Sequence, residues 1–233
     1  MKKKISIIAL LAVLIVPNIF AGSGQAEREV RKVKSFNSVS ANSGIDVFIT
    51  QGSEQSVEVE ASKNSIHRII TEVKGETLHI YVKGSFKWNS KDIKKVYITA
   101  PEFKSISAGG GADVRGVSSV KAEILSLNSS GGADIYLSVE TTTLKLNCSG
   151  GADISVNGTT EQLRAVASGG SDIKADKLMA KYVDVSASGG GDAHVFASEK
   201  IVANASGGGD VHYTGSPKEK DISESGGGDV SGF

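Results

Sequence analysis

The chain repeats one short motif seven times, a run of glycine and other small residues that ends in an aspartate. Six of the seven aspartates are followed by a branched aliphatic residue, and successive aspartates are separated by 21, 19, 19, 20, 18 and 19 residues. The period is regular and shorter than that of helical-repeat solenoids, so it predicts a stack of short coils. The aspartates are Asp113, Asp134, Asp153, Asp172, Asp192, Asp210 and Asp229.

Alternating apolar residues flank each aspartate, which is the pattern of a β-strand with one buried face. After Asp134 they are Ile135 and Leu137, and before the next glycine run they are Leu144 and Leu146. One strand on each side of every turn predicts an all-β fold, a single-stranded parallel β-helix. Parallel crossovers are almost always right-handed, so we expect that hand. The β-helix should cover residues 36–233, with regular Gly-Gly-x-Asp coils over 105–233.

The last inward position before each glycine run holds a small residue through most of the stack. Cys148 is one of these residues and is the only cysteine, so it cannot form an internal disulfide. We interpret it as a small core residue and not as a reactive thiol. The column is Ser129, Cys148, Ala167, Ala187 and Ala205, and Glu224 interrupts it at the final coil.

Residues 36–104 differ from the regular repeat, with longer alternating runs and fewer glycines. The segment around Ser43, Gly44 and Asp46 resembles one degenerate coil. The 67 residues between Asp46 and Asp113 have the length of three to four further periods. We therefore expect irregular coils with hairpin extensions in this half.

The first 21 residues have the form of a secretory signal, with three lysines followed by an apolar run that is short for a membrane span. Residues 22–35 then form an N-terminal lead segment, and no transmembrane segment is expected after signal removal. Loss of those lysines leaves 23 basic residues against 26 acidic ones, which disfavours a nucleic-acid partner. We expect an exported protein located in the periplasm, on the outer surface or outside the cell.

Several motifs together resemble the bacterial family called "putative auto-transporter adhesin, head GIN domain". They are Phe36-x-x-Val39, Ser43-Gly-Ile-Asp46-Val, Gln51-Gly52, Val96-Tyr-Ile-Thr-Ala-Pro101 and the repeated Ser-Gly-Gly-x-Asp-Ile. The likeness covers roughly residues 30–233. It implies a right-handed β-helix of pectin-lyase-like shape, secretion, and an adhesive role without an assigned active site.

The aspartate repeat is the first candidate site. Stacked coils lie ~4.8 Å apart, and two carboxylates at that distance repel by about 1 kcal/mol in water. Hydrogen bonds from glycine N–H groups of the turns would offset this repulsion, and that is the interpretation we favour. A row of calcium ions held by all seven aspartates is the alternative, although the spacing departs from the calcium-binding β-roll repeat. No other cofactor is expected.

Two histidines form a second candidate site, because Asp192-Ala-His194 and Asp210-Val-His212 place like groups on consecutive coils. A transition-metal ion such as zinc would suit such a pair. The alternative is an ordinary exposed column, since other coils place Arg115, Tyr136, Ser155, Lys174 and Ser231 at the same position.

Enzymatic activity is not expected, because a residue present on every coil is better explained by the repeat than by catalysis. The third candidate site is Phe86 and Trp88, in an aromatic and basic segment suited to stacking on sugars or anchoring a protein. A loop that folds its rings over a hydrophobic end is the other interpretation. We expect a non-enzymatic adhesin or display protein for an unknown surface glycan or protein, with a possible homo-oligomer. A polysaccharide-binding or polysaccharide-acting protein, as a lyase or hydrolase, is the alternative.

Overall fold

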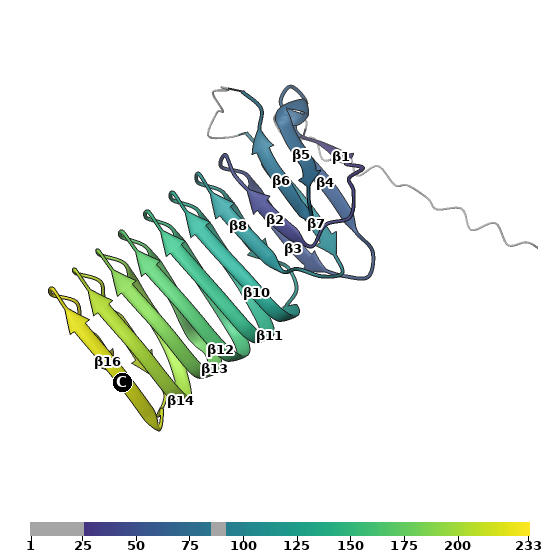
Figure 1. Ribbon diagram of the computed structural model, residues 1–233. Coiled ribbons are helices and arrows are strands. Elements are labelled where there is room, and N and C mark those ends of the chain that lie inside the picture. The colour runs from purple at the N-terminus through teal and green to yellow at the C-terminus, as the bar shows by residue number, and fades with distance from the viewer. Residues whose placement is uncertain (1–25, 85–91) are drawn as a thin grey trace, which may run out of the picture.

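The computed structural model describes residues 26–84 and 92–233, and these form an all-β solenoid (Figure 1). The predicted signal at residues 1–21 lies outside the described residues. One 3₁₀ helix, Ile66–Arg68, interrupts the strands. The strands are β1 (Ala26–Val30), β2 (Ser38–Ala41), β3 (Asp46–Gln51), β4 (Ser56–Ser62), β5 (Ile69–Lys74), β6 (Thr77–Val82), β7 (Lys94–Ala100), β8 (Ser105–Gly109), β9 (Asp113–Gly116), β10 (Val120–Ser130), β11 (Asp134–Ser149), β12 (Asp153–Ser168), β13 (Asp172–Ser188), β14 (Asp192–Ser206), β15 (Val211–Thr214), β16 (Glu219–Ser225) and β17 (Val230–Gly232).

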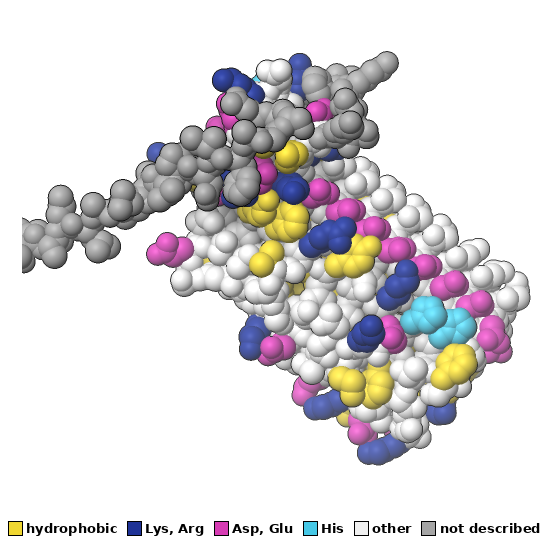
Figure 2. Space-filling model, turned by 180° about the vertical axis from the view of Figure 1, so that it is seen from behind, with side chains coloured by type: hydrophobic (Ala, Val, Ile, Leu, Met, Phe, Trp, Pro, Cys, Tyr) yellow, Lys and Arg dark blue, Asp and Glu magenta, His cyan; other side chains and the backbone are white. Residues whose placement is uncertain are grey.

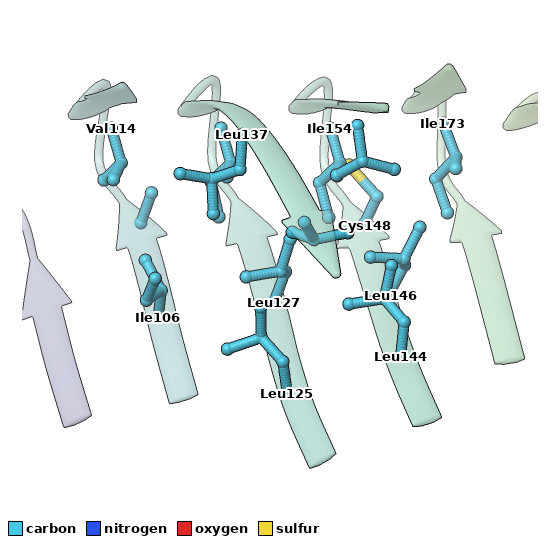
Figure 3. Packing of buried hydrophobic residues seen from close by; sticks show 14 of the residues in the cluster. Ile106, Val114, Leu125, Leu127, Leu137, Leu144, Leu146, Cys148, Ile154 and Ile173 are labelled. Atoms are coloured by element: carbon cyan, nitrogen blue, oxygen red, sulfur yellow. The ribbon is translucent and has the colours of Figure 1, made fainter. Parts of the chain in front are cut away.

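Each regular coil contains two strand segments that lie on opposite sides of a narrow core. We call the segments that follow the aspartates the front sheet and the segments that precede the glycine runs the back sheet. Leu125, Leu127, Leu144 and Leu146 of the back sheet point toward the front sheet (Figure 3). All of these side chains are fully buried, so the alternating pattern is confirmed. The hand of the helix and its likeness to pectin lyases stay predictions.

Glycine is required where the chain passes from the back sheet to the front sheet. Gly150 and Gly151 have φ values of 67° and 71°, a left-handed conformation that is costly for residues with a Cβ atom. The N–H of Gly150 donates to the carbonyl of Ser168 on the next coil at 3.3 Å. The turns therefore stack as regularly as the strands.

The N-terminal half does not follow chain order. Strand β2 lies between β6 and β8, and β3 lies between β7 and β9, all in parallel. Asp46 consequently pairs with Asp113 on the adjacent coil. The expectation that three to four coils separate these aspartates is wrong, because the intervening chain crosses to the outer side of the first coil and returns.

Antiparallel strands complete this end of the stack, as the hairpin expectation requires. Strand β5 pairs with β6, β4 pairs with β7, and β1 pairs with β4. Thus part of the predicted lead segment, Ala26–Val30, is a strand of the fold. The outermost strand β1 carries Glu27, Arg28 and Glu29, and charged side chains on an edge discourage pairing with other chains.

Small residues form the predicted column beside the glycine turns. Ser129, Cys148, Ala167, Ala187, Ala205 and Glu224 lie in register on successive coils. Cys148 is 2% exposed, and its thiol donates a hydrogen bond to the carbonyl of Ala152 at 2.9 Å. On the preceding coil, the Ser129 hydroxyl donates to the carbonyl of Ala133 across the equivalent turn at 2.6 Å. The Cys148 side chain therefore stabilises its own glycine turn by a hydrogen bond across it.

The Cys148 thiol is expected to resist alkylation in the folded protein. Burial raises its pKa to about 11, so at pH 8 very little of the reactive thiolate is present. Iodoacetamide labelling followed by mass spectrometry should show modification only after denaturant is added. Equal labelling rates with and without denaturant would contradict the buried placement.

Candidate functional site

The aspartates form a continuous column along one border of the front sheet, as Figure 2 shows. Asp113, Asp134, Asp153, Asp172 and Asp192 pair in register on neighbouring coils. The column continues because the N–H of Asp210 donates to Asp192 Oδ1 at 3.1 Å, and that of Asp229 donates to Asp210 Oδ1 at 3.0 Å. The predicted stacking is confirmed, and Asp46 adds one carboxylate that the repeat count missed.

A second column runs beside the aspartates on the outer surface of the front sheet, two residues further along each strand. We call it the track. Figure 2 shows basic, hydrophobic and histidine side chains along it. Its members lie in register from coil to coil: Tyr97, Phe48, Arg115, Tyr136, Ser155, Lys174, His194, His212 and Ser231.

Neighbouring side chains of the track contact one another. The rings of Phe48 and Tyr97 stack with centroids 5.1 Å apart. The guanidinium of Arg115 lies 4.7 Å from the centroid of the Tyr136 ring, which is a favourable cation–π distance. These contacts hold rings and cations in line along the solenoid axis.

The track also supplies side-chain partners for four of the aspartates. Arg115 contacts Asp113 at 3.2 Å, and the Tyr136 hydroxyl donates to Asp134 at 3.2 Å. Lys174 lies between two carboxylates, 3.4 Å from Asp153 and 3.5 Å from Asp172. Burial alone would lower the pKa of Lys174, but the two carboxylates outweigh it and raise that pKa.

Glycine N–H groups do not have the role predicted for them. Among the described residues, no hydrogen bond joins a carboxylate of the column to a glycine amide. The first coils use side chains of the track, and the last coils use the backbone N–H of the next aspartate. One glycine amide of each of five successive turns instead donates to a carbonyl of the adjacent coil, at Gly131, Gly150, Gly169, Gly189 and Gly207.

The two histidines lie on adjacent coils as expected. Their rings stack with centroids 4.7 Å apart and an interplanar angle of 27°, and His212 Nδ1 lies 2.7 Å from the Ser231 hydroxyl. The nitrogen lone pairs of the two stacked rings lie in two separate ring planes, so one zinc ion could be bound by both rings only if a ring rotated. Within residues 26–84 and 92–233, no group of three His, Cys, Asp or Glu side chains is arranged to hold a metal ion. Calcium on the aspartate column stays a prediction.

A shallow pocket of about 500 Å³ lies at the C-terminal end of the track. Lys174, His194 and His212 contribute to it from the track, and Phe233 adds an aromatic ring 6.1 Å from that of His212. The pocket therefore combines ring faces with hydrogen-bonding groups. The other candidate residues, Phe86 and Trp88, lie outside the described residues.

Sequence reasoning missed a second set of exposed residues on the back sheet, around Tyr182, which is 50% exposed. Lys145 and Arg164 lie near it on adjacent coils. The available signal was strand alternation, which already placed these residues outward, but they do not repeat from coil to coil. In the described part of the chain, no helix has the length and apolar character needed to cross a membrane.

Comparisons with known proteins agree on the architecture. The model of the family described as "Putative auto-transporter adhesin, head GIN domain" matches residues 35–217. A putative adhesin from Bacteroides fragilis is 27% identical, with a TM-score of 0.83 over 91% of this chain and 98% of that one. No curated protein matches the chain.

Two structures from Parabacteroides distasonis have the same fold. One is a putative adhesin, 22% identical, with a TM-score of 0.69 over 91% of this chain and 98% of that one. The other is a putative lipid binding protein, 22% identical, with a TM-score of 0.67 over 90% of this chain and 98% of that one.

Proposed function

Because the chain belongs to the family of the putative auto-transporter adhesin head GIN domain, we propose that it is an exported, non-catalytic adhesin that binds a surface glycan along the track. The continuity of the track carries this proposal. Rings, cations and carboxylates recur on successive coils from Tyr97 to Ser231. An extended polymer lying along the axis would meet similar groups at each coil.

The chemistry of the track favours a glycan without net charge. Aromatic rings such as Tyr136 present flat apolar faces on which sugar rings stack, and carboxylates accept hydrogen bonds from hydroxyl groups. The cations Arg115 and Lys174 are already paired with aspartates, so the track has little attraction left for an acidic ligand.

Two further observations support the rest of the proposal. The basic and apolar segment at residues 1–21 supports export. A binding role fits a carboxylate that recurs on every coil, since catalysis by paired acids needs a few groups with distinct environments at one place. The front sheet offers the same carboxylate from Asp46 to Asp229.

Removing the Tyr136 ring is expected to weaken glycan binding by up to about tenfold, because aromatic contacts contribute about 0.5–1.5 kcal/mol. A glycan microarray identifies the strongest neutral ligand, and calorimetric titration then compares the wild type with Tyr136→Ala. Met179→Ala is the matched control, since Met179 is 54% exposed and lies outside the track. Unchanged affinity in Tyr136→Ala would refute binding along the track.

A further inference from the structure

A groove of about 340 Å³ lies on the outer surface of the back sheet, where neither the repeat motif nor the track accounts for it. Strands β11 to β14 form it with the parts of each coil that precede the glycine turns. Leu163 and Val183 lie at its base with their side chains directed into the core, and Val202 adds an outward-facing apolar side chain. The groove faces away from the front sheet, so a ligand in it would not contact the track.

Tyr182 gives this groove an aromatic surface. Its ring is half exposed, and the strand register places Gln162 beside it on one side and Lys200 on the other. A half-exposed aromatic ring is a platform on which the face of a sugar ring stacks. The amide of Gln162 can donate to and accept from sugar hydroxyls.

Lys145 and Arg164 add two cations at facing positions of adjacent strands. Like charges placed directly opposite each other in a sheet destabilise it, so this arrangement has a cost. Among the residues that the structure describes, neither cation has a carboxylate oxygen within 4.0 Å. Both are therefore available to an anionic group from outside.

The two faces of the solenoid thus differ in charge chemistry. On the front sheet, Arg115 and Lys174 are paired with aspartates of the same surface. On the back sheet, the guanidinium of Arg164 has its donors free for a carboxylate or sulfate, which it binds in a bidentate manner. The cations of the back-sheet groove therefore favour an acidic ligand, whereas those of the track do not.

We infer that the back-sheet groove is a second binding site, specific for an acidic sugar unit such as a uronate. The sugar ring stacks on Tyr182, and its carboxylate receives hydrogen bonds from Arg164 and Lys145. Asp184 lies next to Arg164 in the register and repels a second negative charge nearby. That repulsion favours a glycan with one acid group per sugar over a dense acidic peptide.

The test compares two probes of equal length, a galacturonate tetrasaccharide and its fully methyl-esterified form. The wild type is expected to bind the acid at least tenfold more tightly than the ester in calorimetric titrations. Arg164→Ala should remove that preference by weakening acid binding about tenfold, in line with the loss of a charged hydrogen-bonded pair. Raising the salt concentration should weaken acid binding in the wild type.

Controls separate this site from general charge effects and from the track. Lys181→Ala removes one exposed positive charge outside the groove, where Lys181 pairs with Glu161 at 3.0 Å, and should leave acid binding unchanged. Tyr136→Ala should also leave it unchanged, so failure of the track and failure of the groove are distinguishable. Equal affinity for the acid and the ester, absence of acid binding, or equal binding of tetraglutamate would each overturn the inference.

Discussion

Gly158→Ala is expected to destabilise the fold by about 3 kcal/mol or more, the sum of backbone strain and overpacking. Gly158 has a φ of 116°, which residues with a Cβ atom rarely adopt. An added Cβ would also overlap the carbonyl oxygen of Val139 on the neighbouring coil. Backbone atoms of a packed coil cannot move aside as a flexible side chain can, so the two coils must separate.

Gly170→Ala is the matched control for this change. Gly170 follows the same strand β12 and also has a positive φ, of 76°, but nothing lies within 4 Å of its added Cβ. Its substitution should cost about 1 kcal/mol, from the backbone conformation alone. Urea unfolding followed by circular dichroism gives both values. If the two variants lost similar amounts of unfolding free energy, the close approach of the neighbouring coil would not be the reason that glycine is needed at position 158.

The regular half of the solenoid was predictable because one residue alternation and one period are repeated many times. Asp134 and Asp153 occupy the same place in successive repeats, and each is followed by an isoleucine, Ile135 or Ile154. Few registers between the two strands bury every apolar side chain of such a pattern. The structure has that register. The small column through Cys148 followed from the same argument, since its members share one inward position.

The order of the first coils was not predictable in this way. The alternation of apolar residues in strands such as β4 and β7 is the same in parallel and in antiparallel pairing. The pattern within one strand therefore does not reveal its partner or the direction of pairing. Val57 pairs with Ile98 and Val59 with Val96 in antiparallel register. Counting periods between Asp46 and Asp113 assumed that the chain adds coils in one direction, and here it reverses.

The candidate site was predicted in position and only partly in chemistry. Alternation placed Arg115, Tyr136 and Lys174 on the outer face, but it gave no information about their rotamers. Their contacts with the aspartates depend on rotamers and on the adjacent coil. Lys145 and Arg164 were missed for another reason, because a search for repeated residues passes over outward positions that change from coil to coil.

Leu125→Ala is expected to cost about 2–5 kcal/mol, the range for removing a large buried side chain and leaving a cavity. Leu125 is fully buried in β10 and lies in register with Leu144 of β11 (Figure 3). Each coil of a solenoid packs only against its neighbours, so the cavity weakens the contact between these two strands directly. Hydrogen exchange should accordingly increase most in β10 and β11.

The adjacent residue of the same strand provides the control. Ile124 is 51% exposed, so Ile124→Ala removes a side chain of the same size from the opposite face and should change stability by less than about 0.5 kcal/mol. Urea unfolding of both variants tests whether these two adjacent residues lie on opposite faces of β10. If Ile124→Ala were as damaging as Leu125→Ala, the inward and outward faces of β10 would have to be reassigned, and with them the register that aligns the aspartates.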